Sequence, residues 1–310
     1  FVDNLKEDLK RRDFTVNAMA YNNKIGIFDC FGGKEDLNDK IIRCVGEPDK
    51  RFCEDALRIM RAIRFSAQLG FTVDKKTNIS IFKNKDLLKN IAVERIQSEF
   101  AKICLSDDFN VYYKYRDVFS VFTENIAVDE DFCKIISKLP PSLPIRLAAF
   151  ILNGLKTDLG ENAAEEAAAF LHNMKFDKRT ASYVCSLIKN YNISVNDDLK
   201  TIRKILSVID YGILYDIIIL KKAFSKNENE QPLFNSILNT MAYIKNNNLC
   251  TKISELDING YDLIEHNLAN GRKTGIILKK LLNEVIDGNV ENNKEKLLEK
   301  AVEAAKDTEE

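Results

Sequence analysis

The sequence has only two histidines, His172 and His266, and no C-x-x-C pair among its seven cysteines. A structural zinc site needs four ligands at short spacing, so none is predicted. The sequence also lacks an apolar run long enough to cross a bilayer, and no signal sequence begins it. We therefore expect a cytoplasmic protein without membrane association, whose cysteines are neutral thiols in a reducing compartment.

Neither sign of charge dominates the chain. Its 310 residues include 46 basic and 47 acidic side chains, for a net charge of -1. Any contact with a nucleic acid must therefore come from a local basic patch and not from the net charge. The length predicts two or more domains or one elongated helical array.

Glycine and proline become rare after Pro48, and helical periodicity dominates from there almost to the end. Before Pro48 the pattern predicts a turn at Asn22-Asn23, a strand at 25–28, a Gly32-Gly33 turn and a second strand at 41–45, antiparallel at a sheet edge. We therefore predict a mainly α protein that begins with the end of an α/β domain. The predicted helices are 51–70, 86–106, 142–153, 161–174, 179–190, 199–211, 213–226, 231–247, 260–265, 271–287 and 293–305.

Four charged residues recur every third position near the start of the helical region. They are Asp55, Arg58, Arg61 and Arg64. One interpretation is an exposed helix face with a single i,i+3 ion pair between Asp55 and Arg58. The other is a phosphate or nucleotide site, because neighbouring arginines repel unless an anion lies between them, and guanidinium groups match phosphate oxygens.

A second polar cluster lies in "EDLKRRDFTVNAMAYN", residues 7–22. Arg11, Arg12 and Asp13, with Asn17, offer a planar cation, an acceptor and an amide, which suit a triphosphate and a ribose. The alternative is an ordinary helix start, with Asp13 or Thr15 as the N-cap and Arg11 on the surface.

Several stretches together resemble one family. "RRDFTVNAMAYN", the D-x-x-G-G turn in "DCFGG", the E-D-x-x-R of "EDALR" and "VERIQSEFAKI" are similar to successive motifs of class II tRNA nucleotidyltransferases and bacterial poly(A) polymerases. "LDINGYDLIEHN" and "TGIILKKLLNEVIDGNVENNKEKLLEKA" resemble the tail of the same family. The combination is specific where each motif alone is not.

The resemblance implies a fold in four parts. Residues 1–48 would be the remnant of an α/β nucleotidyltransferase head, and 49–106 the neck helices that recognise the base. Residues 107–250 would form a helical body, and 251–310 a helical tail that binds tRNA. In the tail, the expected RNA contacts are Arg272, Lys273, Lys279 and Lys280.

The implied activity is the template-independent addition of C and A to the 3′ end of tRNA. CTP and ATP would be the substrates, Mg²⁺ the cofactor and pyrophosphate the product. Asp55 and Arg58 would bind the Watson-Crick edge of the base, and the other nucleotide contacts would be Arg12, Asp13, Asn17, Arg61 and Arg64. Residues expected to support this site are Asp29, Gly32, Gly33, Glu54, Glu94 and Arg95.

The family's metal-binding carboxylates precede the R-R-D motif on a strand, so we expect them upstream of Phe1. Asp3, Glu7 and Asp8 form no D-x-D pair and are not assigned as ligands. The chain would then lack the N-terminal part of its head domain and be inactive alone. The segment 145–158, "IRLAAFILNGLKTD", carries no histidine, so no second metal site is predicted there.

Two alternatives remain open at this point. A poly(A) polymerase, or an enzyme that adds only CC or only A, uses nearly the same motifs. From a different class, a catalytically inactive RNA-binding module would keep the helical body and tail but would not need the base-binding pair.

Overall fold

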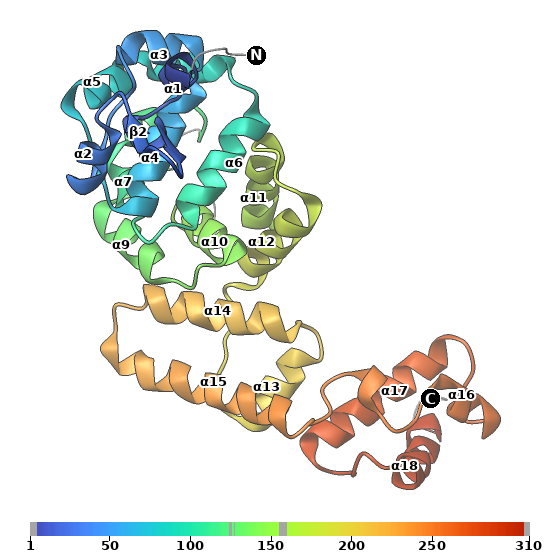
Figure 1. The fold of residues 1–310 in the computed structure, drawn as a ribbon. Coiled ribbons are helices and arrows are strands. Elements are labelled where there is room, and N and C mark those ends of the chain that lie inside the picture. The colour runs from blue at the N-terminus through green and yellow to red at the C-terminus, as the bar shows by residue number, and fades with distance from the viewer. Residues whose placement is uncertain (1–4, 124–125, 127, 155–159, 307–310) are drawn as a thin grey trace. The chain divides into compact units, whose positions relative to one another are not determined.

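The computed structural model describes residues 5–123, 126, 128–154 and 160–306. It is mostly helical with a few short strands, so the predicted mainly α fold is confirmed (Figure 1). The chain divides into two compact units, Phe1–Asn190 and Tyr191–Glu310. The finer division into head, neck, body and tail stays a prediction.

The strands of the first unit are short and form two separate pairs. Strands β1 (Met19–Asn22) and β2 (Gly26–Asp29) form an antiparallel hairpin across the predicted turn. Strand β3 (Ile41–Ile42) pairs instead with β4 (Thr72–Val73), and this pair is parallel.

The predicted antiparallel pairing of 25–28 with 41–45 is therefore wrong. Helix α2 (Gly33–Asn38) follows the Gly32-Gly33 turn and carries the chain away from β2. Strand β3 then pairs with a strand that comes after the next two helices: the N–H of Thr72 donates to the carbonyl of Lys40 at 2.8 Å and that of Asp74 to the carbonyl of Ile42 at 3.0 Å. A parallel pair of this kind needs a long crossover connection.

The remaining helical elements of the first unit surround a core rich in aromatic side chains. Tyr112 stacks on Phe119 with ring centroids 4.6 Å apart, and Phe150 meets Tyr112 edge-on at 5.0 Å. The elements are α1 (Leu5–Lys10), η1 (Thr15–Asn17), α3 (Pro48–Glu54), α4 (Leu57–Leu69), α5 (Lys75–Asn84), η2 (Lys85–Asn90), α6 (Val93–Cys104), α7 (Asn110–Lys114), α8 (Arg116–Phe119), α9 (Glu130–Lys138), α10 (Leu143–Gly154), α11 (Glu161–Asn173) and α12 (Lys178–Asn190).

The predicted helix 51–70 is two helices. Asp55 has extended backbone angles, φ -152° and ψ 101°, and separates α3 from α4. Its carboxylate accepts a hydrogen bond from the backbone N–H of Leu57 at 3.1 Å, which satisfies one of the free amides at the start of α4. The predicted helix 86–106 likewise splits into η2 and α6, and α5 and α9 were not predicted.

Helices α4 and α6 pack against each other through apolar faces and lie side by side in Figure 1. Ile59 and Ile63 of α4 are fully buried, as are Phe100 and Ile103 of α6. This packing also brings Asp55, just before α4, next to Arg95 of α6, and Arg64 of α4 next to Glu99 of α6.

The second unit contains two small apolar cores. One joins α13 (Leu199–Leu206), α14 (Tyr211–Phe224) and α15 (Gln231–Asn246). The other joins α16 (Gly260–Glu265), α17 (Arg272–Asp287) and α18 (Lys294–Lys306). Two short turns, η3 (Glu228–Glu230) and η4 (Ile253–Glu255), complete the unit. Across the described part of the chain, every helix is too short or too polar to span a bilayer.

Candidate nucleotide-binding site

A polar hollow of about 440 Å³ opens on the first unit. Its volume is within the range of small-ligand pockets. Six of the seven predicted nucleotide contacts line it, together with Arg11 of the same polar cluster. The lining residues are Arg11, Arg12, Asp13, Asn17, Asp55, Arg58 and Arg61.

The R-R-D segment forms one wall. Asp13 is buried, and its carboxylate accepts from Nε of Arg61 at 2.7 Å and lies 2.6 Å from Nη2 of the same side chain. Asn17 donates to Asp13 at 3.5 Å. The alternative of an ordinary helix start is wrong, because only the short turn η1 follows and its N-cap is Phe14, without a side-chain cap.

The break between α3 and α4 forms the other wall. Asp55 lies 3.0 Å from Nη2 of Arg95 on α6. Arg58 donates to Glu54 at 2.9 Å and, through its other terminal nitrogen, to the carbonyl oxygen of Arg11 at 3.0 Å. Asp55 and Arg58 therefore have separate ionic partners, and the exposed i,i+3 pair of the alternative interpretation is wrong.

Glu54 is the counter-charge behind Arg58. Hydrogen bonds from Arg51 and Arg58 hold the pKa of Glu54 below its ordinary value, so the carboxylate stays ionised near neutral pH. At the opposite wall, the hydrogen bond from Arg11 likewise lowers the pKa of Asp8. Arg11, Arg12 and Arg58 are thus held in place by acids that lie outside the lining, whereas Arg61 is held by Asp13 within it.

Arg64 does not reach this pocket. Residues three apart on a helix are offset by about 60°, so Arg64 faces away from Arg58 by about 120°. It is buried, and its Nε lies 2.5 Å from Glu99 of α6. Its Nη1 donates to Gln68 at 2.6 Å, and the guanidinium lies 3.9 Å from the ring centre of Phe65. Glu99 was not predicted, although this helical offset could have indicated a buried partner.

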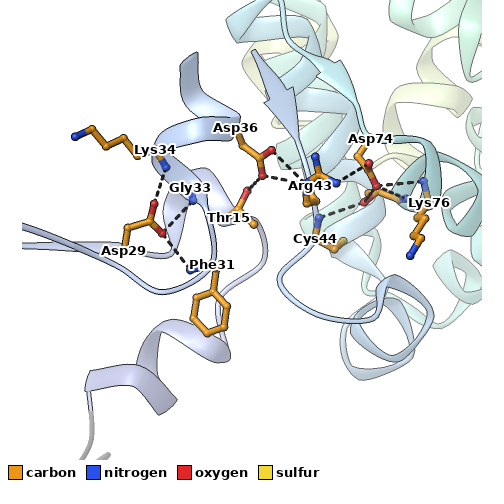
Figure 2. Close-up of polar contacts among 11 residues, drawn as sticks. Thr15, Asp29, Phe31, Gly33, Lys34, Asp36, Arg43, Cys44, Asp74 and Lys76 are labelled. Carbon is orange, nitrogen blue, oxygen red and sulfur yellow. Dashed lines mark hydrogen bonds and ion pairs between the residues drawn. The ribbon is translucent and has the colours of Figure 1, made fainter. Parts of the chain in front are cut away.

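The D-x-x-G-G turn holds α2 against the R-R-D segment (Figure 2). Asp29 accepts from the backbone N–H groups of Gly33 at 3.0 Å and Lys34 at 2.8 Å. Partial burial acts to raise the pKa of Asp29, but these amides outweigh it and the pKa is lowered. Gly32 has φ +74°, and a Cβ on Gly33 would lie 2.1 Å from the carbonyl oxygen of Thr15.

A second polar chain, also drawn in Figure 2, was not predicted from the sequence. Asp36 accepts from the Thr15 hydroxyl at 2.6 Å and from Nε of Arg43 at 3.1 Å. Arg43 also donates to Asp74 at 2.9 Å, and Asp74 caps the start of α5 through the N–H of Thr77. These contacts join α2, β3 and α5 close to the R-R-D segment.

Glu94 is exposed in the first turn of α6, whereas Arg95 and Glu99 of the same helix contact Asp55 and Arg64. The four predicted RNA contacts lie in the second unit, on α17. Arg272, Lys273 and Lys279 are exposed there and Lys280 is half-buried.

Nowhere in the described residues do three His, Cys, Asp or Glu side chains come together as a metal site would require. No Mg²⁺ ligands are therefore assigned among these residues. Asp3 and residues 155–158 of the segment 145–158 lie outside the described residues.

Three families match parts of the chain. Residues 1–43 match the poly A polymerase head domain, and 70–115 match the family described as "Probable RNA and SrmB- binding site of polymerase A". Residues 157–301 match tRNA nucleotidyltransferase domain 2. Fold and site thus define a protein of the nucleotidyltransferase and poly(A) polymerase class.

Individual relatives identify the family more narrowly than these domain matches do. The chain is 32% identical to the CCA-adding enzyme of Lactobacillus helveticus over 94% of its own length and 71% of that enzyme. It is 52% identical to the CCA-adding enzyme of Bacillus subtilis over 103 residues, 33% of this chain and 26% of that enzyme. The chain belongs to the family of CCA-adding enzymes, and the resemblance stated from its motifs is confirmed.

Solved structures agree with this assignment. The Bacillus stearothermophilus CCA-adding enzyme in complex with CTP matches with a TM-score of 0.74 and 28% identity, over 100% of this chain and 76% of that one. The Thermotoga maritima CCA-adding enzyme complexed with tRNA shares the fold, with a TM-score of 0.63 at 22% identity over 95% of this chain and 73% of that one.

Proposed function

We propose that this protein acts in the template-independent addition of C and A to the 3′ end of tRNA in the cytoplasm, and that the pocket beside α4 selects CTP and ATP. Family membership supports the reaction. One observation supports the selection of CTP and ATP: Asp55 and Arg58, an acceptor and a donor, line one pocket with the R-R-D segment.

The base preference follows from the order of hydrogen-bond acceptor and donor in the pair Asp55 and Arg58. Cytosine and adenine each present an amino donor beside a ring-nitrogen acceptor, so the amino group donates to Asp55 and the ring nitrogen accepts from Arg58. Guanine and uracil present the reverse pattern, with a carbonyl acceptor beside an N–H donor. They would leave both protein groups unpaired, at a cost of about 1 to 3 kcal/mol for each group.

Both members of the pair are already oriented before a nucleotide binds. Arg95 holds one oxygen of Asp55, and the N–H of Leu57 holds the other. Glu54 and the carbonyl oxygen of Arg11 fix the guanidinium of Arg58. Less conformational entropy is then lost on binding, which favours recognition by a few well-placed groups.

The other side chains of the pocket suit the rest of the nucleotide. Arg11 and Arg12 are exposed cations at its rim and are assigned to the triphosphate, together with Arg61. Asp13 and Asn17 supply an acceptor and an amide for the ribose hydroxyls. Arg64 is buried against Glu99, so we do not include it among the nucleotide contacts; instead it holds α4 against α6.

Replacing Arg58 with alanine tests the selection step. We expect Arg58→Ala in the full-length protein to reduce the preference for CTP over UTP at least tenfold, because one directional hydrogen bond of about 1.4 kcal/mol is lost. Incorporation of each of the four nucleotides into tRNA lacking its CCA end provides the measurement.

Arg116→Ala is the matched control, since Arg116 is an exposed arginine on α8 away from the pocket. It should keep the original preference, and both variants should bind tRNA as the unaltered protein does. An unchanged nucleotide preference in Arg58→Ala would show that this residue does not read the base.

A further inference from the structure

Helix α15 and the turn after it form an unusual surface of the second unit. No aspartate or glutamate occurs from residue 231 to 254, although the chain has 47 acidic residues in 310. The exposed side chains of α15 include Asn235, Asn239 and Tyr243, spaced four residues apart and therefore on one face. A face of amides and an aromatic ring offers hydrogen bonds and stacking without repelling phosphates.

A cleft of about 600 Å³ lies at the C-terminal end of this helix. Tyr211, Lys245, Asn248 and Lys252 are among its lining residues. The ammonium of Lys245 lies 5.2 Å from the ring centre of Tyr211. Within the described part of the chain, Lys245 has no carboxylate at ion-pair distance, whereas Lys252 lies 3.6 Å from Asp210.

Two acids, Glu255 and Asp257, also line the cleft, and they differ in the hydrogen bonds that their carboxylates accept. The carboxylate of Glu255 is occupied by the N–H of Thr251 at 2.7 Å and the N–H of Lys252 at 3.0 Å. Asp257 is exposed, and its backbone N–H, not its carboxylate, bonds to Asn292. Asp257 can therefore be replaced without breaking the backbone contacts that Glu255 makes, so it is the acid to remove when a bound phosphate is tested.

We propose that the exposed face of α15 and this cleft bind the RNA substrate, and that the cleft takes one unpaired nucleotide. The base would stack on Tyr211 in place of the Lys245 ammonium, since cations and bases use the same ring face. Lys245 would then bind the phosphate of that nucleotide. This inference rests on the proposed function, because it assumes an RNA substrate, but it concerns a surface separate from the basic residues of α17.

The test is the binding of a fluorescent tRNA transcript that lacks its CCA end, measured over a range of salt concentrations. Lys245→Gln should reduce the slope of log affinity against log salt by about one, as for one lost phosphate contact. Tyr211→Leu should weaken binding about tenfold with the slope unchanged. Lys134→Gln, an exposed lysine of α9 in the first unit, is the control and should bind normally.

Asp257→Asn separates a direct contact from a folding defect. Removing this carboxylate should tighten RNA binding severalfold, and a misfolded variant would not do so. A blunt RNA duplex of the same length serves as the second probe. Tyr211→Leu should bind it as tightly as the unaltered chain does, because a duplex has no unpaired base to stack.

The outcomes distinguish this inference from the function on which it rests. If the unaltered protein binds no RNA, both are overturned. If it binds tRNA and the three cleft variants bind equally well, only the inference fails. An equal loss for Tyr211→Leu on both probes would overturn the assignment of an unpaired nucleotide to the cleft.

Discussion

Arg61 and Arg64 lie one turn apart on α4 and have opposite surroundings. Arg61 is one-third exposed and pairs with Asp13 inside the pocket. Arg64 is buried and pairs with Glu99, with its guanidinium over the ring of Phe65. Two arginines with the same spacing in the sequence therefore differ: Arg61 faces the pocket, and Arg64 holds α4 and α6 together.

This difference predicts different effects of the same substitution. Arg64→Met should lower the free energy of unfolding by about 3 kcal/mol, because the buried Glu99 would keep only the half-exposed Lys102 as an ionic partner. Arg61→Met should cost about 1 kcal/mol, because the pair of Arg61 is partly screened by solvent and Asp13 keeps the hydrogen bonds from Phe14 N–H and Asn17. It should also weaken nucleotide binding. Urea denaturation measures the free energy of unfolding of both variants. Equal stability losses, or nucleotide binding lost more in Arg64→Met, would contradict the assignment.

The two adjacent glycines of the D-x-x-G-G turn offer a second comparison. Gly33→Ala places a Cβ 2.1 Å from a backbone oxygen, so α2 must shift, at about 3 kcal/mol. Gly32→Ala meets open space and has only the strain of φ +74°, about 1 kcal/mol. Thermal unfolding should rank the unaltered protein first, then Gly32→Ala, then Gly33→Ala. The reverse order of the two variants would show that Gly33 is not in close contact with Thr15.

At the scale of elements, a helix was predictable where a cap or an apolar pattern marks it, and the two-residue strands were not. The predicted helix 260–265 coincides with α16 because an Asn259 cap and a regular apolar pattern mark it. Strands β3 and β4 have two residues each, too few for a periodic pattern. The break at Asp55 was missed because its cause is a side-chain hydrogen bond, while the surrounding apolar residues keep helical spacing.

The candidate site was predictable for a different reason. Motifs named Asp13, Asp55 and Arg58, and the fold brings the two segments together across about 40 positions of sequence. Motifs do not show which face a side chain occupies, so Arg64 was expected among the nucleotide contacts. Its partner Glu99 lies in the segment VERIQSEFAKI, but that segment does not show which residue Glu99 contacts.

The contact between α3 and α5 predicts a dependence on pH. Asp49 of α3 accepts from Lys83 of α5 at 2.5 Å and from Asn84 at 2.9 Å. The hydrogen bond from Lys83, with that of Ser80, lowers the pKa of Asp49 to about 2. A lowered carboxylate pKa stabilises the fold above the ordinary value of 3.8 and ceases to do so as pH falls towards about 2.

Asp49→Asn should remove this contribution. The Tm of the unaltered protein should fall more steeply between about pH 4 and pH 2 than the Tm of the variant. Asp131→Asn is a suitable control, since Asp131 is an exposed acid of α9 that pairs with Lys134 of its own helix. If the Asp49→Asn curve runs parallel to that of the unaltered protein, the carboxylate does not join α3 to α5 in solution.

At the scale of the whole molecule, each unit has one buried arginine that donates to backbone carbonyl groups. In the first unit, Arg146 donates to Cys104 at 2.9 Å and to Leu139 at 2.8 Å. In the second, Arg203 of α13 donates to Cys250 at 2.7 Å and to Val285 at 3.3 Å, which joins the two cores of that unit. Burial lowers the pKa of both guanidinium groups.

The two arginines allow a test of whether the units unfold separately. Arg146→Met and Arg203→Met should each cost about 3 kcal/mol, because the carbonyl groups they satisfy would remain buried without donors. Hydrogen exchange followed by peptide shows where stability is lost. Arg203→Met should reduce protection in 191–310 and leave the core of 1–190 protected, and Arg146→Met should do the reverse. Equal loss throughout the chain in both variants would mean that the two units unfold as one, because a local defect is shared only when the cooperative unit is the whole molecule.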